Sequence, residues 1–272
     1  MYLQHWKLSE TPFPSALSAS GYCANPAHEE ALARMRFLVD RTQGLGLLLG
    51  GGGSGKSLLL EVLAAEVRRS GGAAVRIALS GLEPVELLAA VAVGLSLNPD
   101  RDATLPQLWS AVRDRLIENR CQKLATVVML DDADEATLDV RDQVLRLVQL
   151  GGLHASRLAL ILSSRLQSLP SLGRRLLELA DLRIDLSPWE LADTEAYLHH
   201  ALARAGRTEP AFEPEAVQHL HSLTQGNPRA INQVADLAMV ATAAQGLSLV
   251  DSHTVDAVVN ELGVTAFVEM EG

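Results

Sequence analysis

The sequence predicts an α/β protein in which helices cover both faces of a parallel five-stranded sheet, followed by a smaller all-α domain. Up to about residue 187, apolar strand-like runs alternate with segments of helical periodicity, and only helical segments follow. The composition supports this class, since hydrophobic residues make up 48% of the 272 residues and aromatic residues only 4%. A core built mainly from leucine and alanine suits a helix-rich α/β protein better than a β-sandwich.

Five short runs rich in aliphatic residues are expected to form the strands. The run from Leu124 to Leu130 is continuously apolar, which is typical of a strand that is buried on both faces of a parallel sheet. A helix between successive strands favours the parallel arrangement, because the chain has to cross over the sheet before the next strand begins. The predicted strands cover residues 45–49, 73–79, 124–130, 158–163 and 182–186.

The helices of this first domain are predicted from apolar residues at three- and four-residue spacing and from residues that start or end helices. Pro84 stands in a first turn, where its missing N–H costs nothing, and Gly151-Gly152 is a stop signal. After the helix that follows the first strand, helices are expected over residues 84–95, 105–119, 137–150 and 169–179.

Four helices in a row are predicted after Ser187-Pro188, over residues 191–204, 214–224, 228–245 and 251–262. No strand is needed in this part of the chain. We therefore expect an N-terminal arm over residues 1–30, an α/β core over residues 31–187 and a helical domain over residues 188–272.

The most informative segment, Gly50 to Ser57, matches the phosphate-binding pattern G-x-x-x-x-G-K-[ST] between a predicted strand and a predicted helix. The glycines let successive backbone N–H groups turn toward an anion, and the helix that follows directs its positive end to the same place. Lys56 would contact the β- and γ-phosphates, and the Ser57 hydroxyl would ligate Mg²⁺. The predicted nucleotide-binding residues here are Gly50, Gly51, Gly52, Gly53, Ser54, Gly55, Lys56, Ser57 and Leu58.

Two carboxylates, Asp131 and Asp132, come directly after the apolar run that begins at Thr126. Ligands bind at the carboxyl ends of parallel strands, so these side chains are expected to lie beside the phosphate loop. We expect Asp131 to hold Mg²⁺ together with Ser57, and Asp132 to polarise the attacking water.

The net charge bears on whether nucleic acid is a partner, and the cysteine content bears on the cellular compartment. The net charge is −10 and Lys and Arg are scattered, so nucleic acid is a possible but not a favoured partner. No apolar run is long enough for a membrane span, and the N-terminus lacks the features of a signal peptide. Cys23 and Cys121 are far apart and have no zinc-type spacing, which indicates free thiols in the cytoplasm.

Taken together, these motifs resemble those of AAA+ ATPases, and more narrowly those of the general secretion pathway A (ExeA-like) family. The family begins with Tyr-x-x-His-Phe-x-Leu-x-x-x-Pro-Phe and carries Gly-x-Pro-Arg-x-Ile-Asn in its helical lid. The matching segments here are Tyr2 to Leu8, Pro12-Phe13 and Gly226 to Asn232. The resemblance covers nearly the whole chain and implies ATP and Mg²⁺ as ligands, with residues 188–272 as the lid.

The resemblance also assigns roles to further residues. Arg229 resembles the lid arginine that senses the γ-phosphate, and Ser163 or Ser164 would be the polar sensor at the end of the fourth strand. Arg183 resembles the arginine finger that a neighbouring subunit receives, with Arg174 and Arg175 as alternatives. Such an arrangement implies self-association, because an arginine supplied in trans completes the site between subunits.

The chain departs from the family in two places. The family usually has Asp-Glu after its third strand, whereas this chain has Asp131-Asp132. Since Asp is one methylene shorter than Glu, and a displacement of about 1 Å can lower a rate by about 10²-fold, hydrolysis is expected to be slow. Larger family members also continue into a membrane helix and a peptidoglycan-binding part, so we expect a short form without a membrane helix.

Three functions are compatible with these features. The favoured one is a cytoplasmic ATPase that drives or regulates assembly of a secretion or pilus-like protein machine, whose protein partner the sequence does not identify. The alternatives are a nucleotide-dependent DNA-binding adaptor, similar to transposition helper ATPases, and a nucleotide-gated scaffold with little turnover.

Overall fold

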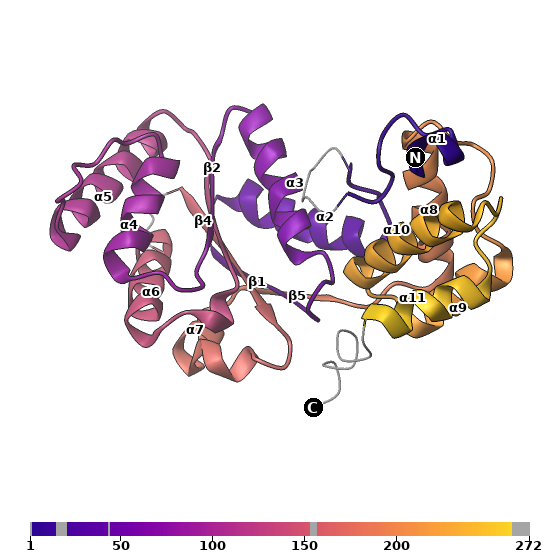
Figure 1. The fold of residues 1–272 in the computed structure, drawn as a ribbon. Coiled ribbons are helices and arrows are strands. Elements are labelled where there is room, and N and C mark those ends of the chain that lie inside the picture. The colour runs from indigo at the N-terminus through magenta and orange to yellow at the C-terminus, as the bar shows by residue number, and fades with distance from the viewer. Residues whose placement is uncertain (1, 15–20, 43, 153–156, 263–272) are drawn as a thin grey trace. The chain divides into compact units, whose positions relative to one another are not determined.

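The structure, a computed structural model, describes residues 2–14, 21–42, 44–152 and 157–262 (Figure 1). Contacts divide the chain into two compact units, which are considered separately below. The sheet unit consists of Pro26–Gly50 and Lys56–Leu186. The helical unit consists of Met1–Asn25, Gly51–Gly55 and Ser187–Gly272.

The sheet unit contains a five-stranded sheet with the order β2-β3-β4-β1-β5. All neighbouring strands are parallel, which confirms the predicted architecture. The strands are β1 (Gly44–Gly50), β2 (Ala73–Ala78), β3 (Thr126–Asp131), β4 (Leu158–Arg165) and β5 (Leu182–Leu186).

Helices cover both faces of this sheet. On one face lie α2 (Pro26–Arg41) and α3 (Lys56–Arg69); on the other lie α4 (Pro84–Gly94) and α6 (Leu138–Gly152), with α5 (Leu105–Cys121) packed against α4 (Figure 1). Alternate strand residues such as Leu47, Val128 and Leu160 join the core on the α4 side. The intervening residues of each strand therefore point to the side covered by α3, which we call the α3 face. Arg76 of β2 and Ser163 of β4 are among them.

The predicted helix over residues 169–179 is divided in the structure. A 3-10 turn, η3 (Leu169–Leu172), precedes a short helix, α7 (Arg174–Glu178). Gly173 separates them with φ 83°, a left-handed conformation that cannot continue a helix. A second 3-10 turn, η2 (Ala133–Glu135), follows β3.

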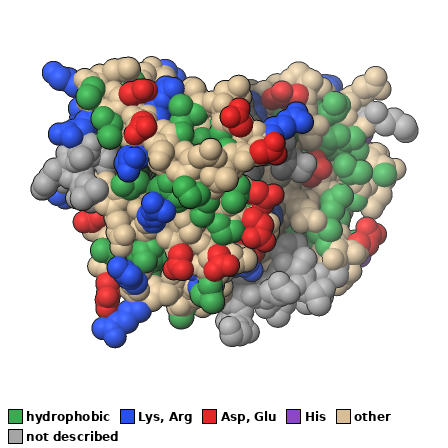
Figure 2. Space-filling model, turned by 90° about the vertical axis from the view of Figure 1, so that its left-hand side faces the viewer, with side chains coloured by type: hydrophobic (Ala, Val, Ile, Leu, Met, Phe, Trp, Pro, Cys, Tyr) green, Lys and Arg blue, Asp and Glu red, His purple; other side chains and the backbone are tan. Residues whose placement is uncertain are grey.

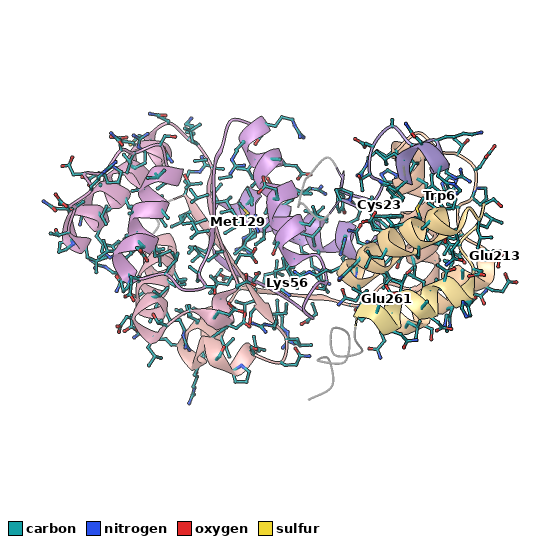
Figure 3. All side chains as sticks on the ribbon, in the orientation of Figure 1. Trp6, Cys23, Lys56, Met129, Glu213 and Glu261 are labelled. Atoms are coloured by element: carbon teal, nitrogen blue, oxygen red, sulfur yellow. The ribbon has the colours of Figure 1, made fainter. Side chains whose placement is uncertain are left out.

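The helical unit has its own core. Its helices are α1 (Tyr2–Trp6), α8 (Leu191–Arg204), α9 (Pro214–Thr224), α10 (Pro228–Gln245) and α11 (Ser252–Leu262). The N-terminal segment packs into this core, since Trp6 is buried and its indole Nε1 donates to the carbonyl of Met239 at 2.9 Å (Figure 3). Helix α2, which begins at Pro26 inside the range predicted for the arm, belongs to the sheet unit.

The turn before α10 has a conformation that only glycine can adopt there. Gly226 has φ 70°, and a Cβ built on it would lie 2.2 Å from the carbonyl oxygen of Trp189. The next residue, Asn227, is the N-cap of α10, and its side-chain oxygen accepts from the backbone N–H groups of Arg229 and Ala230. The segment Gly226 to Arg229 thus forms a tight, capped helix start.

Candidate functional site

The glycine-rich segment connects a buried strand to a helix. Strand β1 ends at Gly50 and α3 begins at Lys56, with Gly51–Gly55 between them. Gly53 has φ 80° and Gly55 has φ 96°, both in the left-handed region that side chains disfavour. Backbone N–H groups at such a turn and at the start of a helix form a concave surface that suits phosphate oxygens. The loop therefore fits the phosphate groups of a nucleoside triphosphate.

Lys56 is a buried residue at the start of α3, only 7% exposed (Figure 3). Its Nζ donates to the carbonyl of Gly50 at 2.9 Å, so the ammonium group is held at the carboxyl end of β1. Ser57 and Leu58 follow it in the first turn of α3. A buried cation at this point offers a direct charge partner for bound phosphate.

Asp131 is the last residue of β3 and is almost fully buried. The Ser163 hydroxyl donates to its Oδ1, and Arg76 Nη2 donates to its Oδ2 at 2.7 Å. Burial by itself raises the pKa of Asp131, but the polar groups of Ser163, Arg76 and Ser57 outweigh burial and lower it. The carboxylate is thus held in its ionised form.

Asp131 and Ser57 together offer hard oxygen donors, which are the ligands that Mg²⁺ prefers. Across the described ranges, no group of three or more His, Cys, Asp or Glu side chains could hold a metal ion. A magnesium ion usually takes only one or two protein ligands and completes its shell with water and substrate phosphates. The pair therefore fits a magnesium ion that is bound with a nucleotide.

Asp132 follows immediately, with φ 52° and ψ 46°. This left-handed conformation is several-fold more accessible to Asp and Asn than to other non-glycine residues. Burial and then the neighbouring charges of Asp131, Glu135 and Asp134 raise the pKa of Asp132, while Lys56 opposes that rise. The carboxylate therefore lies within electrostatic range of the buried Lys56, at the end of the sheet where the phosphate loop begins.

The two serines predicted as sensors differ in their contacts. Both are fully buried in β4. Ser163 donates to Asp131 and accepts from the backbone N–H of Asp132 at 3.1 Å, whereas the Ser164 hydroxyl donates to the carbonyl of Arg165 at 3.0 Å. Only Ser163 is joined to the paired carboxylates.

Two arginines at the site were not found from the sequence. Arg76 contacts Asp131 from β2, and Arg165, at the end of β4, contacts the turn after Asp132. Arg165 Nε lies 3.0 Å from Asp134 Oδ2, its Nη2 contacts Glu135, and the Asp134 side chain is only 3% exposed. Neither arginine stands in a local motif, and only the register of the strands brings each to its carboxylate.

The arginines predicted from the resemblance lie at the surface. Arg183 is the second residue of the edge strand β5 and is exposed, with Nε 3.0 Å from Asp185 Oδ1. Arg174 and Arg175 begin α7 and are exposed as well. In the sheet register, Arg183 pairs with Leu47 of β1, three residues before Gly50.

Arg229 is the second residue of α10 and is exposed. Within the helical unit, its backbone N–H lies 3.3 Å from the carbonyl of Gly53, and Asn227 Nδ2 donates to the carbonyl of Gly52 at 2.6 Å. The capping residue of α10 therefore also hydrogen-bonds the glycine loop.

Among the described residues, no helix has both the length and the apolarity needed to cross a membrane.

Comparisons with known proteins agree with this arrangement. A family model described as an AAA domain matches residues 39–169. General secretion pathway protein A of Aeromonas hydrophila is 32% identical over 250 residues, which cover 90% of this chain and 46% of that protein. The chain thus spans less than half the length of this relative.

Solved structures share the fold at low sequence identity. ORC1 of Aeropyrum pernix, in a complex with DNA, has a TM-score of 0.69 at 16% identity, covering 95% of this chain and 69% of that one. Cdc6p of Pyrobaculum aerophilum has a TM-score of 0.71 at 20% identity, covering 92% and 70%. The RuvB branch migration motor of Thermotoga maritima has a TM-score of 0.62 at 13% identity, covering 93% and 74%.

Proposed function

Because this chain is an AAA+ P-loop protein that resembles general secretion pathway protein A, we propose that it binds ATP with Mg²⁺ and hydrolyses it slowly. One observation carries the proposal. Lys56, Ser57 and Asp131, from the first turn of α3 and the end of β3, lie together with an ionised carboxylate held beside the serine hydroxyl. This combination suits a magnesium-bound triphosphate.

Binding is assigned to the loop and the start of α3. The backbone N–H groups from Gly51 to Leu58 and the positive end of α3 would hold the phosphates, and Lys56 would exchange its bond to Gly50 for one to a phosphate oxygen. Ser57 and Asp131 would hold Mg²⁺, which neutralises charge on the phosphates when bound.

Hydrolysis is assigned to Asp132, which would orient the attacking water and accept a hydrogen bond from it. Ser163 supports this role, since it bonds both Asp131 and the backbone of Asp132. The left-handed backbone at Asp132 gives a reason for Asp instead of Glu, because Asp tolerates that conformation better. The shorter side chain is expected to make turnover slow.

Completion of the site by a second subunit is proposed from the resemblance to AAA+ proteins. We place an arm at residues 1–30, a core at residues 31–187 and a lid at residues 188–272. Arg229 of the lid would sense the γ-phosphate. Arg183, or else Arg174 or Arg175, would be supplied by a neighbouring subunit. The exposure of Arg183, Arg174 and Arg175 supports the trans role, because an arginine finger has to reach another molecule.

The biological role is proposed from the similarity to general secretion pathway protein A. We infer that nucleotide turnover changes how subunits and a protein partner of a secretion or pilus-type machine associate, on the cytoplasmic side of the membrane. Because the chain spans only 46% of that relative, the partner and the pathway remain part of the proposal.

The first test is binding of a fluorescent ATP analogue by Lys56→Ala and by Lys123→Ala, a control at an exposed position. We expect Lys56→Ala to weaken binding by about 100-fold or more, since a charge-assisted phosphate contact is lost, and the control to bind normally. Asp132→Asn should bind ATP as the parent does and lose turnover. Unchanged ATP affinity in Lys56→Ala would contradict the assignment.

Assembly is tested by light scattering with and without ATP, with turnover measured across protein concentration. Turnover per subunit that rises with concentration supports shared sites, and constant turnover contradicts them. Nucleotide binding with almost no turnover at any concentration would favour a nucleotide-gated scaffold.

A DNA-binding adaptor is the alternative, because fold relatives include proteins solved on DNA. On the face drawn in Figure 2, basic and acidic side chains are interspersed, and the net charge is −10, neither of which favours a DNA groove. ATP-dependent binding in a salt-dependent gel shift would support it.

A further inference from the structure

The strongest unassigned feature of the site is Arg76, in the middle of the edge strand β2. Its Nη2 lies 2.7 Å from Asp131 Oδ2, and its Nη1 lies 3.6 Å from Glu61 Oε2 of α3. The Arg76 side chain is 25% exposed and that of Asp131 only 2%. An arginine is therefore paired with the carboxylate that the proposed function assigns to Mg²⁺.

The register of β2 and β3 explains this contact. Ala78 pairs with Asp131, and Arg76 stands two residues earlier, so both charged side chains point to the α3 face. Glu61, on the helix that packs against β2, partly balances the guanidinium from the other side. Glu61, Arg76 and Asp131 thus form a carboxylate–guanidinium–carboxylate series that ends at the proposed metal ligand.

The guanidinium is not fully satisfied by these contacts. Its Nε is buried and has no hydrogen-bond partner within the described residues. A buried N–H without a partner is unfavourable for folding. Stabilisation of β2 alone therefore does not explain an arginine at this position. The shortest contact of its guanidinium is the one with Asp131.

The contact leaves Asp131 with both oxygens engaged. Ser163 donates to Oδ1 and Arg76 donates to Oδ2. Arginine stays protonated at every physiological pH, so this positive charge cannot be removed by titration. A divalent cation at Asp131 must therefore share the carboxylate with Arg76 or displace it, and the two cations repel each other.

We propose that Arg76 is a positioning residue that competes with Mg²⁺ for Asp131 and so raises the Mg²⁺ concentration that the nucleotide site needs. The inference rests on the proposed function, since it takes Asp131 as a magnesium ligand. With Arg76 in place, the guanidinium balances the negative charge of the Asp131 carboxylate when no phosphate is bound. The site therefore binds a metal ion weakly until a nucleotide is present. Phosphate oxygens supply the extra negative charge that makes metal binding favourable.

The test compares Arg76→Met, which keeps most of the apolar stem and removes the charge, with Arg68→Met. Arg68 is a matched control because it also approaches Glu61, at 3.7 Å, and has no contact with Asp131 among the described interactions. Binding of fluorescent ADP is measured in EDTA and then across a Mg²⁺ titration. Binding of Mn²⁺ to the nucleotide-free protein is measured by electron paramagnetic resonance.

We expect Arg76→Met to lower the Mg²⁺ concentration at half-effect by at least about threefold, since a nearby positive charge is gone. The variant should also bind Mn²⁺ without nucleotide more tightly than the parent does. Arg68→Met should stay within about twofold of the parent, as expected for an exposed pair. A half-effect concentration that is unchanged or higher in Arg76→Met would overturn the proposal.

Two further variants keep the result interpretable. Arg76→Gln is a second neutral replacement in case the Met variant unfolds, and Arg76→Lys keeps a cation and should keep the high Mg²⁺ requirement. If the parent and Asp131→Asn respond identically to Mg²⁺, the proposed function itself fails at this residue. If the parent responds to Mg²⁺ and both neutral variants behave like it, only the inference about Arg76 fails.

Discussion

The backbone N–H of Asp132 donates a hydrogen bond to Ser163 Oγ at 3.1 Å, while the same hydroxyl donates to Asp131. The buried Ser163 side chain thus links the carboxylate of Asp131, the proposed metal ligand, to the backbone of Asp132, which is proposed to orient water. Because Asp132 sits in a left-handed conformation, this bond also helps to hold an uncommon backbone geometry.

Ser163→Ala is expected to lower turnover by about 10- to 100-fold, because Asp132 loses the bond that positions it. ATP affinity should change much less, since Lys56 and the loop are untouched. The half-buried N–H of Asp132 loses its partner, so we also expect a loss of stability of about 1 kcal/mol. Steady-state turnover and urea unfolding measure the two effects.

Ser164→Ala is the matched control for this prediction. Ser164 is equally buried, but its hydroxyl bonds only the carbonyl of the next residue among the described contacts. Turnover in this variant should stay close to that of the parent. An equal loss in both serine variants would show that strand packing, and not the link to Asp132, decides the rate.

Asp132→Asn is expected to stabilise the nucleotide-free protein at neutral pH. The folded protein raises the pKa of Asp132 through burial and three neighbouring carboxylates, so its ionised form is less favourable in the folded than in the unfolded chain. Removal of that charge should raise the melting temperature by about 1–3 °C in EDTA. As pH falls through the raised pKa of Asp132, the carboxylate becomes protonated and the difference from the parent should disappear.

A constant difference between Asp132→Asn and the parent from pH 7 to pH 4 would contradict this explanation. Asp131 behaves in the opposite sense. Its folded pKa is lowered, so it contributes stability above its unfolded value of 3.8, and that contribution is lost as pH falls through the folded value.

Arg165→Met is expected to destabilise the protein and reduce turnover, because Asp134 would become a buried carboxylate without its guanidinium. Arg165 is 46% exposed, which moderates the effect, and we expect a loss of about 1–2 kcal/mol in urea unfolding. Addition of Asp134→Asn to Arg165→Met should recover part of that loss. If the two substitutions are simply additive, the Arg165–Asp134 pair contributes no coupling.

Two adjacent glycines in the loop are expected to respond differently to alanine. Gly53 has φ 80°, and a Cβ there would lie 2.6 Å from Asn227 Oδ1, whereas a Cβ on Gly52 meets nothing within 4 Å. Gly53→Ala should lower the stability of the nucleotide-free protein by about 1 kcal/mol or more, and Gly52→Ala should leave it unchanged.

Both variants should weaken ATP binding, because a methyl group on the loop obstructs phosphate approach. Thermal unfolding without nucleotide and a fluorescent ATP titration separate the two effects. Equal stability of the two variants would show that the loop is free to rearrange around Gly53.

Features that depend on local patterns were predicted well. The limits of three helices of the helical unit, over residues 191–204, 214–224 and 228–245, agree with the structure to the residue. Pro214 and Pro228 at the first helical positions, and Gly246 after the last turn of α10, mark three of these limits in the sequence itself. The division at Gly173 was missed, because an apolar periodicity continues on both sides of it.

Features that depend on strand register were not predicted. Arg76 and Arg165 reach their carboxylates from neighbouring strands, 55 and 31 residues away in the sequence. The choice between Ser163 and Ser164 also needed the register, because adjacent residues of a strand point to opposite faces.

The sequence by itself determined the order of strands and helices and the glycine loop between β1 and α3, because these follow from local backbone preferences and short-range periodicity. The tertiary structure alone decided which charged side chains meet on the α3 face. The contact between Arg76 and Asp131 depends on the pairing of Ala78 with Asp131, which the crossover through α4 and α5 sets and no local pattern encodes. For that reason the two proposed metal ligands could be named from the sequence, whereas the cation beside Asp131 became visible only in the fold.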